Sequence, residues 1–185
     1  MSTVDHTLPN RQMTMTLLMT PDMANFSGNV HGGIVLKLLD QVAYACASRY
    51  AGMYVVTLSV DQVMFRQPIH VGEVVTFLAS VNYVGRTSME IGVKVIAENI
   101  QTQVVRHANS CFFTMVAVDE AGRPCPAPPF TPATADELRR FEAEAGLLDQ
   151  RDDGILAQIA GLQLFVGGQV GAGPVIHHTQ HAARL

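Results

Sequence analysis

Residues 32–52, GGIVLKLLDQVAYACASRYAG, are the stretch that decides the fold. Apolar side chains recur in it at three- and four-residue spacing, which is typical of an amphipathic helix with one buried face. Those side chains are Val35, Leu38, Leu39, Val42 and Cys46. A glycine pair precedes the apolar positions, and Gly52 follows them as a helix C-cap would. The stretch therefore predicts one long buried helix.

Strand patterning lies on both sides of this helix. Residues 11–20 precede it, and four further segments follow it at 53–65, 73–84, 88–100 and 104–118. The breaks between the four segments are short, whereas a parallel crossover needs about a dozen residues or more. We therefore expect antiparallel neighbours and an α+β fold, with a highly curved antiparallel sheet wrapped around one central helix.

The composition limits the classes of function. Of the 185 residues, 48% are hydrophobic and only 15% are charged, so the chain must bury a core, and we expect further burial between subunits. Twelve basic against sixteen acidic residues give a net charge of −4, which argues against a nucleic-acid-binding protein. Residues 1–12 lack the basic and apolar regions of a secretory signal, so we expect a cytoplasmic protein.

The C-terminal part of the chain differs in composition from the rest. A proline-rich stretch follows residue 123, and residues 135–150 predict a charged surface helix. We expect a core domain over 1–130, the surface helix within 131–150 and a tail over 151–185. The apolar segment 155–176 contains five glycines and three glutamines, which makes a membrane span improbable. It is expected to pack in an oligomer contact or to be partly disordered.

The glycine pair and an acid two turns later carry the chemistry. Backbone N–H groups at Gly32 and Gly33 can point at an incoming oxygen with the helix dipole behind them, although a flexible turn has the same composition. Asp40 follows Gly33 by seven residues, on nearly the same helix face. It is either a solvated surface acid or a desolvated base or nucleophile. The periodicity alone leaves both readings open.

Histidine and cysteine patterns point to structural roles. His31, beside the glycines, suggests a triad with Ser27 or Ser59, but the GxSxG elbow is missing, so we assign His31 a structural or orienting role. No paired His or Cys spacing in the core indicates a metal, and we predict none. The three cysteines are odd in number and read as reduced thiols, with Cys46 and Cys111 packing as small hydrophobic residues.

A series of motifs in order resembles a known enzyme family. The motifs are ANFSGNVHGG, KLLDQVAYACASRY, VVTLSVDQVMFRQPIHVGEVV, VGRTSMEIGVKVIAENI and FFTMVAVDEAGRPCPAP. Together they resemble the hotdog-fold acyl-CoA thioesterases of the YciA and brain acyl-CoA hydrolase group, over residues 21–129. The resemblance implies a hotdog fold and hydrolysis of fatty acyl-CoA to free fatty acid and coenzyme A, without a cofactor because coenzyme A is part of the substrate.

The resemblance also implies site residues and a partner. Asn25 matches the loop asparagine of the family and Asp40 its helical acid, so a homodimer would build each site from Asn25 of one subunit and Asp40 of the other. The N–H of Gly33, with that of Gly32, would polarise the thioester carbonyl. The segment containing Arg86, Thr87 and Ser88 would contact the nucleotide of coenzyme A; by itself it reads as an ordinary hairpin turn. Members of the family often assemble as trimers of dimers.

The sequence leaves two further anion-binding candidates and two alternative functions. Arg66 and Arg106 are weaker candidates for the same anion as Arg86. A hotdog dehydratase or hydratase is one alternative function, which the lack of a convincing catalytic histidine in the helix disfavours. A non-catalytic acyl-CoA-binding module is the other, which the joint presence of Asn25, the glycines and Asp40 disfavours.

Overall fold

One antiparallel sheet and one long helix make up most of the chain in the computed structural model, which describes residues 10–143 apart from the side chain of Gln62. The elements are β1 Gln12–Leu18, a short 3-10 helix Pro21–Met23, α1 Gly32–Ala51, β2 Val55–Phe65, β3 Val74–Val84, β4 Ser88–Asn99 and β5 Val104–Ala117. The strand order is β1-β3-β4-β5-β2, and every pair of neighbours is antiparallel. The predicted α+β class is confirmed.

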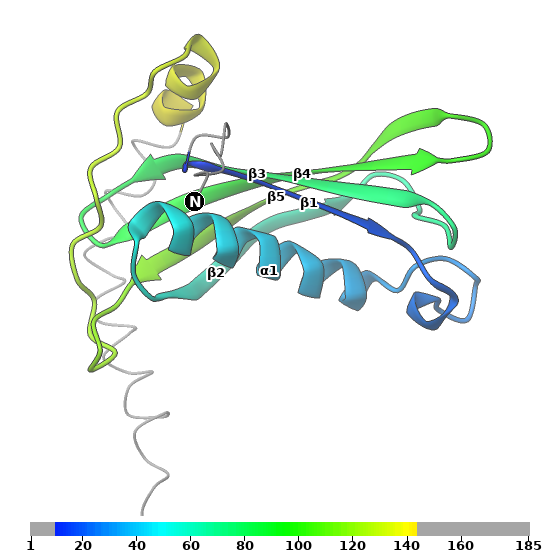
Figure 1. Cartoon of the computed structure of the whole chain (residues 1–185), viewed down its shortest axis with the longest axis horizontal. Helices are drawn as coiled ribbons and strands as arrows, with labels where there is room; N and C mark the ends of the chain where they lie inside the picture. Colours follow the sequence, from blue (N-terminus) through cyan, green and yellow to red (C-terminus); the bar gives the residue numbers. More distant parts are fainter. Residues whose placement is uncertain (1–9, 144–185) are drawn as a thin grey trace, which may run out of the picture.

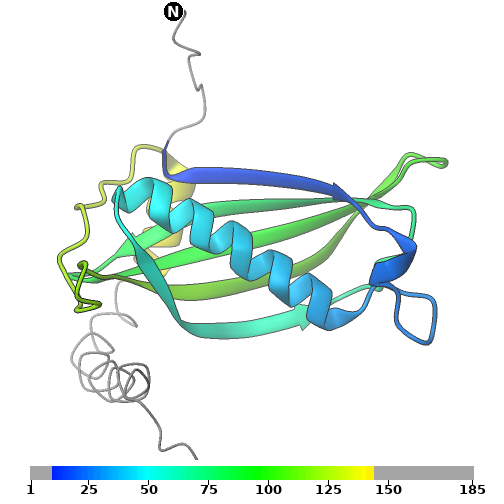
Figure 2. The ribbon, with the colours of Figure 1, turned by 60° about the horizontal axis from the view of Figure 1, so that its bottom comes forward.

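Helix α1 lies diagonally across one face of the sheet, and the core fills the space between them (Figure 1, Figure 2). Leu39 and Val42 of the helix are buried with Phe77 of β3 and Phe113 of β5. Burying side chains of this size contributes about 1.5–3 kcal/mol each, so the layer between α1 and the sheet stabilises the fold. The helix ends at Gly52, whose φ of +67° favours glycine and whose N–H donates to the Ser48 carbonyl at 2.9 Å. The predicted helix end is confirmed.

Cys46 and Cys111 are both fully buried free thiols in this core. Burial raises the pKa of each thiol to about 12, so both remain protonated and unreactive at neutral pH. Their predicted role as small packing residues is confirmed.

The face of the sheet opposite α1 holds a buried polar network. The Ser80 hydroxyl donates to Asn82 Oδ1 at 3.0 Å, and Asn82 Nδ2 donates to Glu90 Oε1 at 2.9 Å. Gly92 of β4 lies opposite Ser80 of β3, and a Cβ at Gly92 would collide with the Asn82 amide. The absence of a side chain at Gly92 therefore makes room for Asn82.

Replacing Gly92 by alanine is expected to lower the free energy of unfolding by about 1–3 kcal/mol, because the added methyl group displaces Asn82 from its two partners. Denaturant unfolding measures the loss. The control places the same substitution in an Asn82→Ala background. There the loss of unfolding free energy should be smaller, because the Asn82 amide no longer collides with the added methyl group. Equal losses in both backgrounds would contradict this account.

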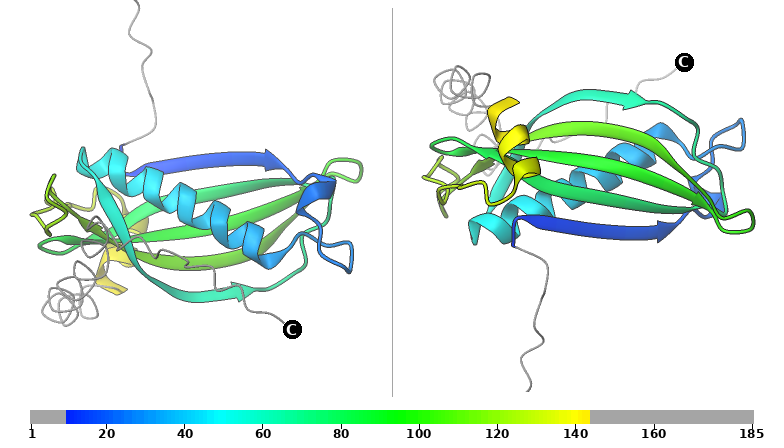
Figure 3. Two further views of the ribbon diagram at one scale, coloured as in Figure 1. Left: turned by 90° about the horizontal axis from the view of Figure 1, so that it is seen from below. Right: turned by 90° about the horizontal axis from the view of Figure 1, so that it is seen from above.

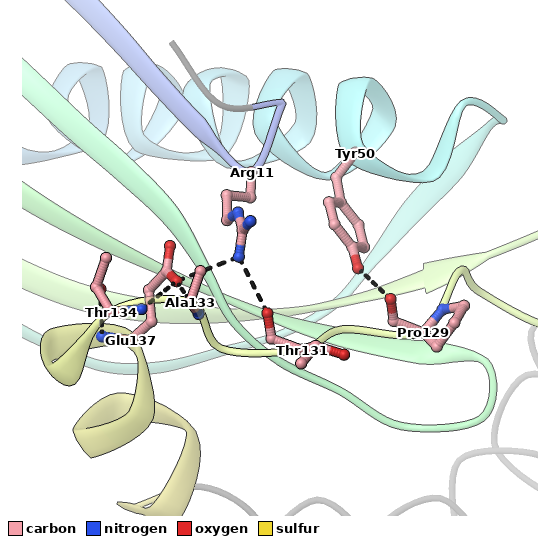
Figure 4. Close-up of polar contacts among 7 residues, drawn as sticks. All are labelled: Arg11, Tyr50, Pro129, Thr131, Ala133, Thr134 and Glu137. Carbon is pink, nitrogen blue, oxygen red and sulfur yellow. Dashed lines mark hydrogen bonds and ion pairs between the residues drawn. The ribbon is translucent and has the colours of Figure 1, made fainter.

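The chain after β5 is tied back to the start of the domain (Figure 4). The Tyr50 hydroxyl at the end of α1 donates to the Pro129 carbonyl at 2.9 Å. Arg11 donates to the Thr131 carbonyl at 3.1 Å and pairs with Glu137 at 3.2 Å, and its guanidinium lies 5.6 Å from the centre of the Phe130 ring. These contacts hold residues 128–137 against the domain.

The helix predicted from residue 135 begins there and continues to the last described residue. A capping box starts it: the Glu137 N–H donates to Thr134 Oγ1, and the Thr134 N–H donates to the Glu137 carboxylate, each at 3.2 Å. Helix 135–143 lies on the face opposite α1, where the Phe141 ring is 5.0 Å from that of Tyr83 (Figure 3). The expected surface helix is thus anchored on one side, with Glu137 buried.

Residues 144–150 of the predicted surface helix and the predicted tail, including residues 155–176, lie outside the described residues. Their expected roles and the domain boundaries at 130 and 150 therefore stay predictions. Within residues 10–143, no helix has the length and apolar character that crossing a bilayer requires.

Candidate active site

The start of α1 is capped by a histidine. His31 Nδ1 accepts a hydrogen bond from the Gly33 N–H at 2.9 Å, and the His31 carbonyl accepts from Ile34 and Val35. The structural role expected for His31 is confirmed. Because the Gly33 N–H already has an acceptor, a thioester carbonyl that uses this donor must take the place of the His31 ring.

Asn25 organises the loop before α1. Its Oδ1 accepts from the Ser27 N–H at 2.9 Å and from the Asn29 N–H at 3.2 Å, and Gly28 completes the turn with a φ of +77°. The carboxamide oxygen is thereby committed to the loop. Its Nδ2 is the atom of this side chain that suits a carbonyl or a water molecule as acceptor.

A cavity of about 310 Å³ lies between this loop, the start of α1 and the end of β2. Asn25, Gly32 and Val35 line one side of it, and Phe65 and Arg66 line the other. The structure thus brings together Asn25, the first glycine and one of the weaker cationic candidates. Asp40 is not among the described residues that line this cavity.

Asp40 accepts a hydrogen bond from a residue of strand β2. It is partly exposed on α1, and its Oδ1 accepts a hydrogen bond of 2.7 Å from the hydroxyl of Thr57 in β2. The same hydroxyl lies 3.3 Å from the sulfur of Met115. With Oδ1 held by Thr57, the Asp40 carboxylate is oriented by a neutral donor and has its second oxygen for a further partner.

Sequence reasoning missed Thr57. The strand pattern at 53–65 shows a threonine among valines, which is ordinary strand composition. Only the packing of α1 on β2 brings this hydroxyl to Asp40. A polar residue at the inward-facing position of a strand beside an acid-bearing helix is the signal that would have pointed to it.

The three predicted coenzyme A contacts differ in exposure. Arg86 is exposed, whereas Thr87 and Ser88 are buried at the start of β4. The Thr87 carbonyl accepts from the Ala117 N–H, and the Ser88 carbonyl accepts from the Gly85 N–H. Of this group, Arg86 therefore presents its side chain to solvent, and the role of all three stays a prediction.

Arg106, by contrast, has a structural partner. It forms two hydrogen bonds, of 2.5 and 2.6 Å, with the Glu73 carboxylate and donates to the Pro68 carbonyl at 2.7 Å. These bonds hold the β2–β3 connection against β5. The prediction that Arg106 is a weaker candidate for the same anion as Arg86 is corrected, because the Glu73 carboxylate already pairs with its guanidinium.

The chain is similar in sequence to a known family and to several curated proteins. The model of the thioesterase superfamily matches residues 27–104. Protein VdlD of Helicobacter pylori (strain ATCC 700392 / 26695) is 49% identical over 154 residues, which cover 83% of this chain and 87% of that protein. The cytosolic acyl coenzyme A thioester hydrolase of Rattus norvegicus is 36% identical over 143 residues, which cover 76% of this chain and 38% of that protein.

Solved structures share the fold. An apo-hexameric acyl-CoA thioesterase has a TM-score of 0.72 and 36% identity, covering 77% of this chain and 91% of its own. An acyl-CoA hydrolase of Staphylococcus aureus has a TM-score of 0.70 and 25% identity, covering 84% of this chain and 94% of its own, and its variants include an aspartate and a threonine replaced by alanine. Those two positions are 17 residues apart, the spacing of Asp40 and Thr57 here. The chain belongs to the thioesterase superfamily, among the hotdog-fold acyl-CoA thioesterases.

Proposed function

We propose that two copies of this chain hydrolyse fatty acyl-CoA to free fatty acid and coenzyme A at sites that both copies share. The observation that carries the proposal is the hydrogen bond from Thr57 to Asp40, which orients a carboxylate on α1 at the open edge of the sheet. The spacing shared with the two substituted residues of the S. aureus hydrolase supports a role for this pair in the reaction.

Helix geometry argues that each site is shared. Asp40 follows Gly33 by seven residues, so the two lie about 10 Å apart along the axis of α1. A nucleophilic carboxylate must lie within about 3 Å of the carbonyl carbon whose oxygen contacts the N–H donor. Two groups about 10 Å apart on one helix cannot meet that requirement, so for this role we place the glycines of one subunit beside Asp40 of the other.

Strand β2 supplies a surface for that partner. Within residues 10–143 it is an edge strand of the sheet, so one side of its backbone has no neighbouring strand among the described residues. Large apolar side chains at or beside it are between 45% and 61% exposed: Tyr54, Val60, Met64 and Phe65. Burying them between subunits would place two Asp40–Thr57 pairs at one interface.

The residues have the following roles in this proposal. The N–H of Gly33, with that of Gly32, polarises the thioester carbonyl, and Asn25 Nδ2 orients the carbonyl or the attacking water. Asp40 acts as a base that takes a proton from this water, or as a nucleophile that forms a transient anhydride. In the base pathway, the carbon–sulfur bond breaks after water adds, and the proton that Asp40 took from water passes to the departing thiolate of coenzyme A. In the nucleophile pathway, Asp40 displaces that thiolate, and water then hydrolyses the anhydride, which frees the fatty acid, regenerates the carboxylate and supplies the proton for the thiolate.

The remaining parts of the proposal concern binding, assembly and location. Arg86, Thr87 and Ser88 lie beside the nucleotide half of coenzyme A, where the exposed guanidinium suits a phosphate. No cofactor takes part. The assembly is a homodimer or a trimer of dimers, which the hexameric relative supports, and the cytosolic relative supports a location in the cytoplasm.

Release of free thiol from a panel of acyl-CoA chain lengths tests the activity directly. Turnover that varies with chain length is expected, and a flat signal across the panel would overturn the proposal. Hydration of crotonyl-CoA is the assay for the dehydratase alternative, and no hydration is expected because α1 carries no histidine to share the chemistry with Asp40.

Replacing Thr57 by valine is expected to lower kcat about tenfold with little change in KM, because the Asp40 carboxylate loses the donor that orients it. Thr57→Ser keeps the hydroxyl and should restore most of the rate. Steady-state kinetics of both variants provide the comparison. An equal loss in the serine variant would show that the threonine methyl, and not its hydroxyl, matters.

A further inference from the structure

A second cavity, of about 490 Å³, lies on the face of the sheet opposite α1. Its walls come from the start of β1, from the middle of β3, β4 and β5, and from helix 135–143, which rests on this face (Figure 3). Gly92 forms part of its floor, where a side chain would otherwise stand. The sheet separates this cavity from Asp40 and the start of α1.

Three cationic side chains line this outer cavity: Lys94 from β4, and Arg139 and Arg140 from the helix. Among the described residues that line it, none is acidic. Arg139 is 72% exposed and makes a long 3.8 Å contact with the 79% exposed Asp136, and such an exposed pair contributes little. The wall therefore carries a local positive charge on a chain whose net charge is −4.

Arg140 has a donor without an acceptor. Its Nε is buried from solvent and has no hydrogen-bond partner within the described part of the chain. A buried charged donor left unpaired costs free energy, so binding of an acceptor at this atom would be favourable. The planar guanidinium group suits the paired oxygens of a phosphate.

The rest of the wall suits an organic molecule. Ser80, Asn82 and Ser110 provide polar atoms, and Phe112 and Leu78 are 36% and 37% exposed. One carboxylate, Glu90, adjoins this wall, but it is 5% exposed and accepts from Asn82. The volume is within the range of small-molecule sites, and the partly exposed Phe112 ring offers an apolar surface for a flat group.

We propose that this outer cavity binds a phosphate-bearing organic anion. The phosphate lies against Lys94, Arg139 and Arg140, and the organic part contacts Phe112 and Leu78. The nucleotide half of coenzyme A and a separate organic phosphate have the same chemistry. The nucleotide would lie here instead of beside Arg86, Thr87 and Ser88, and kinetics of the variants distinguish the two sources.

Calorimetric titration of the full chain with inorganic pyrophosphate at low salt tests the charged part. Arg140→Gln is expected to weaken pyrophosphate binding about tenfold, as loss of one charge-assisted contact does. Arg123→Gln is the matched control, because Arg123 is an exposed arginine outside this cavity and its removal changes the net charge equally. Lys94→Gln tests pyrophosphate binding a second time, with a cationic residue that lies on β4 and not on the helix. If all variants bind pyrophosphate as the parent does, or the parent does not bind it, the proposal is overturned.

Phenyl phosphate tests the organic part. Phe112→Ala is expected to weaken binding of phenyl phosphate and to leave that of pyrophosphate unchanged, since only the first probe has a ring to contact Phe112. Equal effects on both probes would overturn the organic part of the proposal. Neither titration depends on thioester hydrolysis, so failure here and failure of the proposed function are separate results.

Kinetics then identify the source. If coenzyme A occupies the outer cavity, Arg140→Gln raises the KM for acyl-CoA and pyrophosphate inhibits competitively. If a separate organic phosphate occupies it, pyrophosphate binds without competing, and the KM of Arg140→Gln equals that of the parent. Both results support a phosphate site on this face.

Discussion

Replacing Asp40 by asparagine is expected to lower kcat for thioester hydrolysis by about 10³-fold, while the protein stays folded. Asparagine has the same shape and still offers an oxygen to the Thr57 hydroxyl, so the contact between α1 and β2 survives. The amide cannot accept a proton from water and is a poor nucleophile. The rate loss therefore reports the chemical role of the carboxylate, separately from its structural role.

Thiol-release kinetics measure the loss, and thermal unfolding with sizing of the assembly is the control. The unfolding temperature and the size of the assembly should match those of the parent, because Asp40 is partly exposed and the substitution keeps its volume. A single turnover of the parent in ¹⁸O-labelled water tests the nucleophile role: attack of water at the Asp40 carbon of the anhydride places the label in the protein, which a base pathway cannot do. Unchanged kcat in Asp40→Asn would remove Asp40 from the mechanism.

Replacing Glu73 by alanine is expected to lower the free energy of unfolding by about 3–5 kcal/mol. Glu73 is 2% exposed, pairs with Arg106 through both of its carboxylate oxygens, and accepts from the His70 N–H at 2.8 Å. Its removal leaves a largely buried guanidinium without its anion. The loss should also loosen the β2–β3 connection, whose Pro68 carbonyl accepts from the same Arg106.

The pair also makes stability depend on pH. Burial alone would raise the pKa of Glu73, but the hydrogen bonds from Arg106 and the His70 N–H outweigh it and hold that pKa below its ordinary value of 4.5. A lowered pKa in the folded state means that the stabilisation is complete above the unfolded-state pKa and is lost as pH falls through the folded-state pKa. Denaturant unfolding should therefore show an acid-side decline that is weaker in Glu73→Gln.

The exposed Asp119–Arg123 pair is the control for this effect. Arg123 is 72% exposed, so solvent screens the pair, and Arg123→Gln should change stability far less than Glu73→Ala does. Similar losses in the two variants would contradict a special contribution from the buried pair.

Much of the architecture could be predicted from local patterns. The spacing of apolar residues over 32–52 predicted α1 and its end at Gly52, and alternation predicted five strands with antiparallel neighbours. Both patterns reflect which face of an element meets the core, and that requirement is written into each segment. The ordered motifs likewise led to the hotdog thioesterase family. The chemistry at Asn25, Gly33 and Asp40 followed from the resemblance, and it stays a prediction.

The tertiary structure decided the contacts between segments that are distant in sequence. Thr57 meets Asp40 because α1 crosses β2, and Arg106 meets Glu73 because the β2–β3 connection folds onto β5. Arg140 lines the same cavity as Gly92 and Phe112 only because helix 135–143 returns to the face of the sheet opposite α1. Periodicity records whether a side chain is buried, but not which partner it meets; that depends on strand order, register and the crossing of the helix, which form only when the whole chain packs.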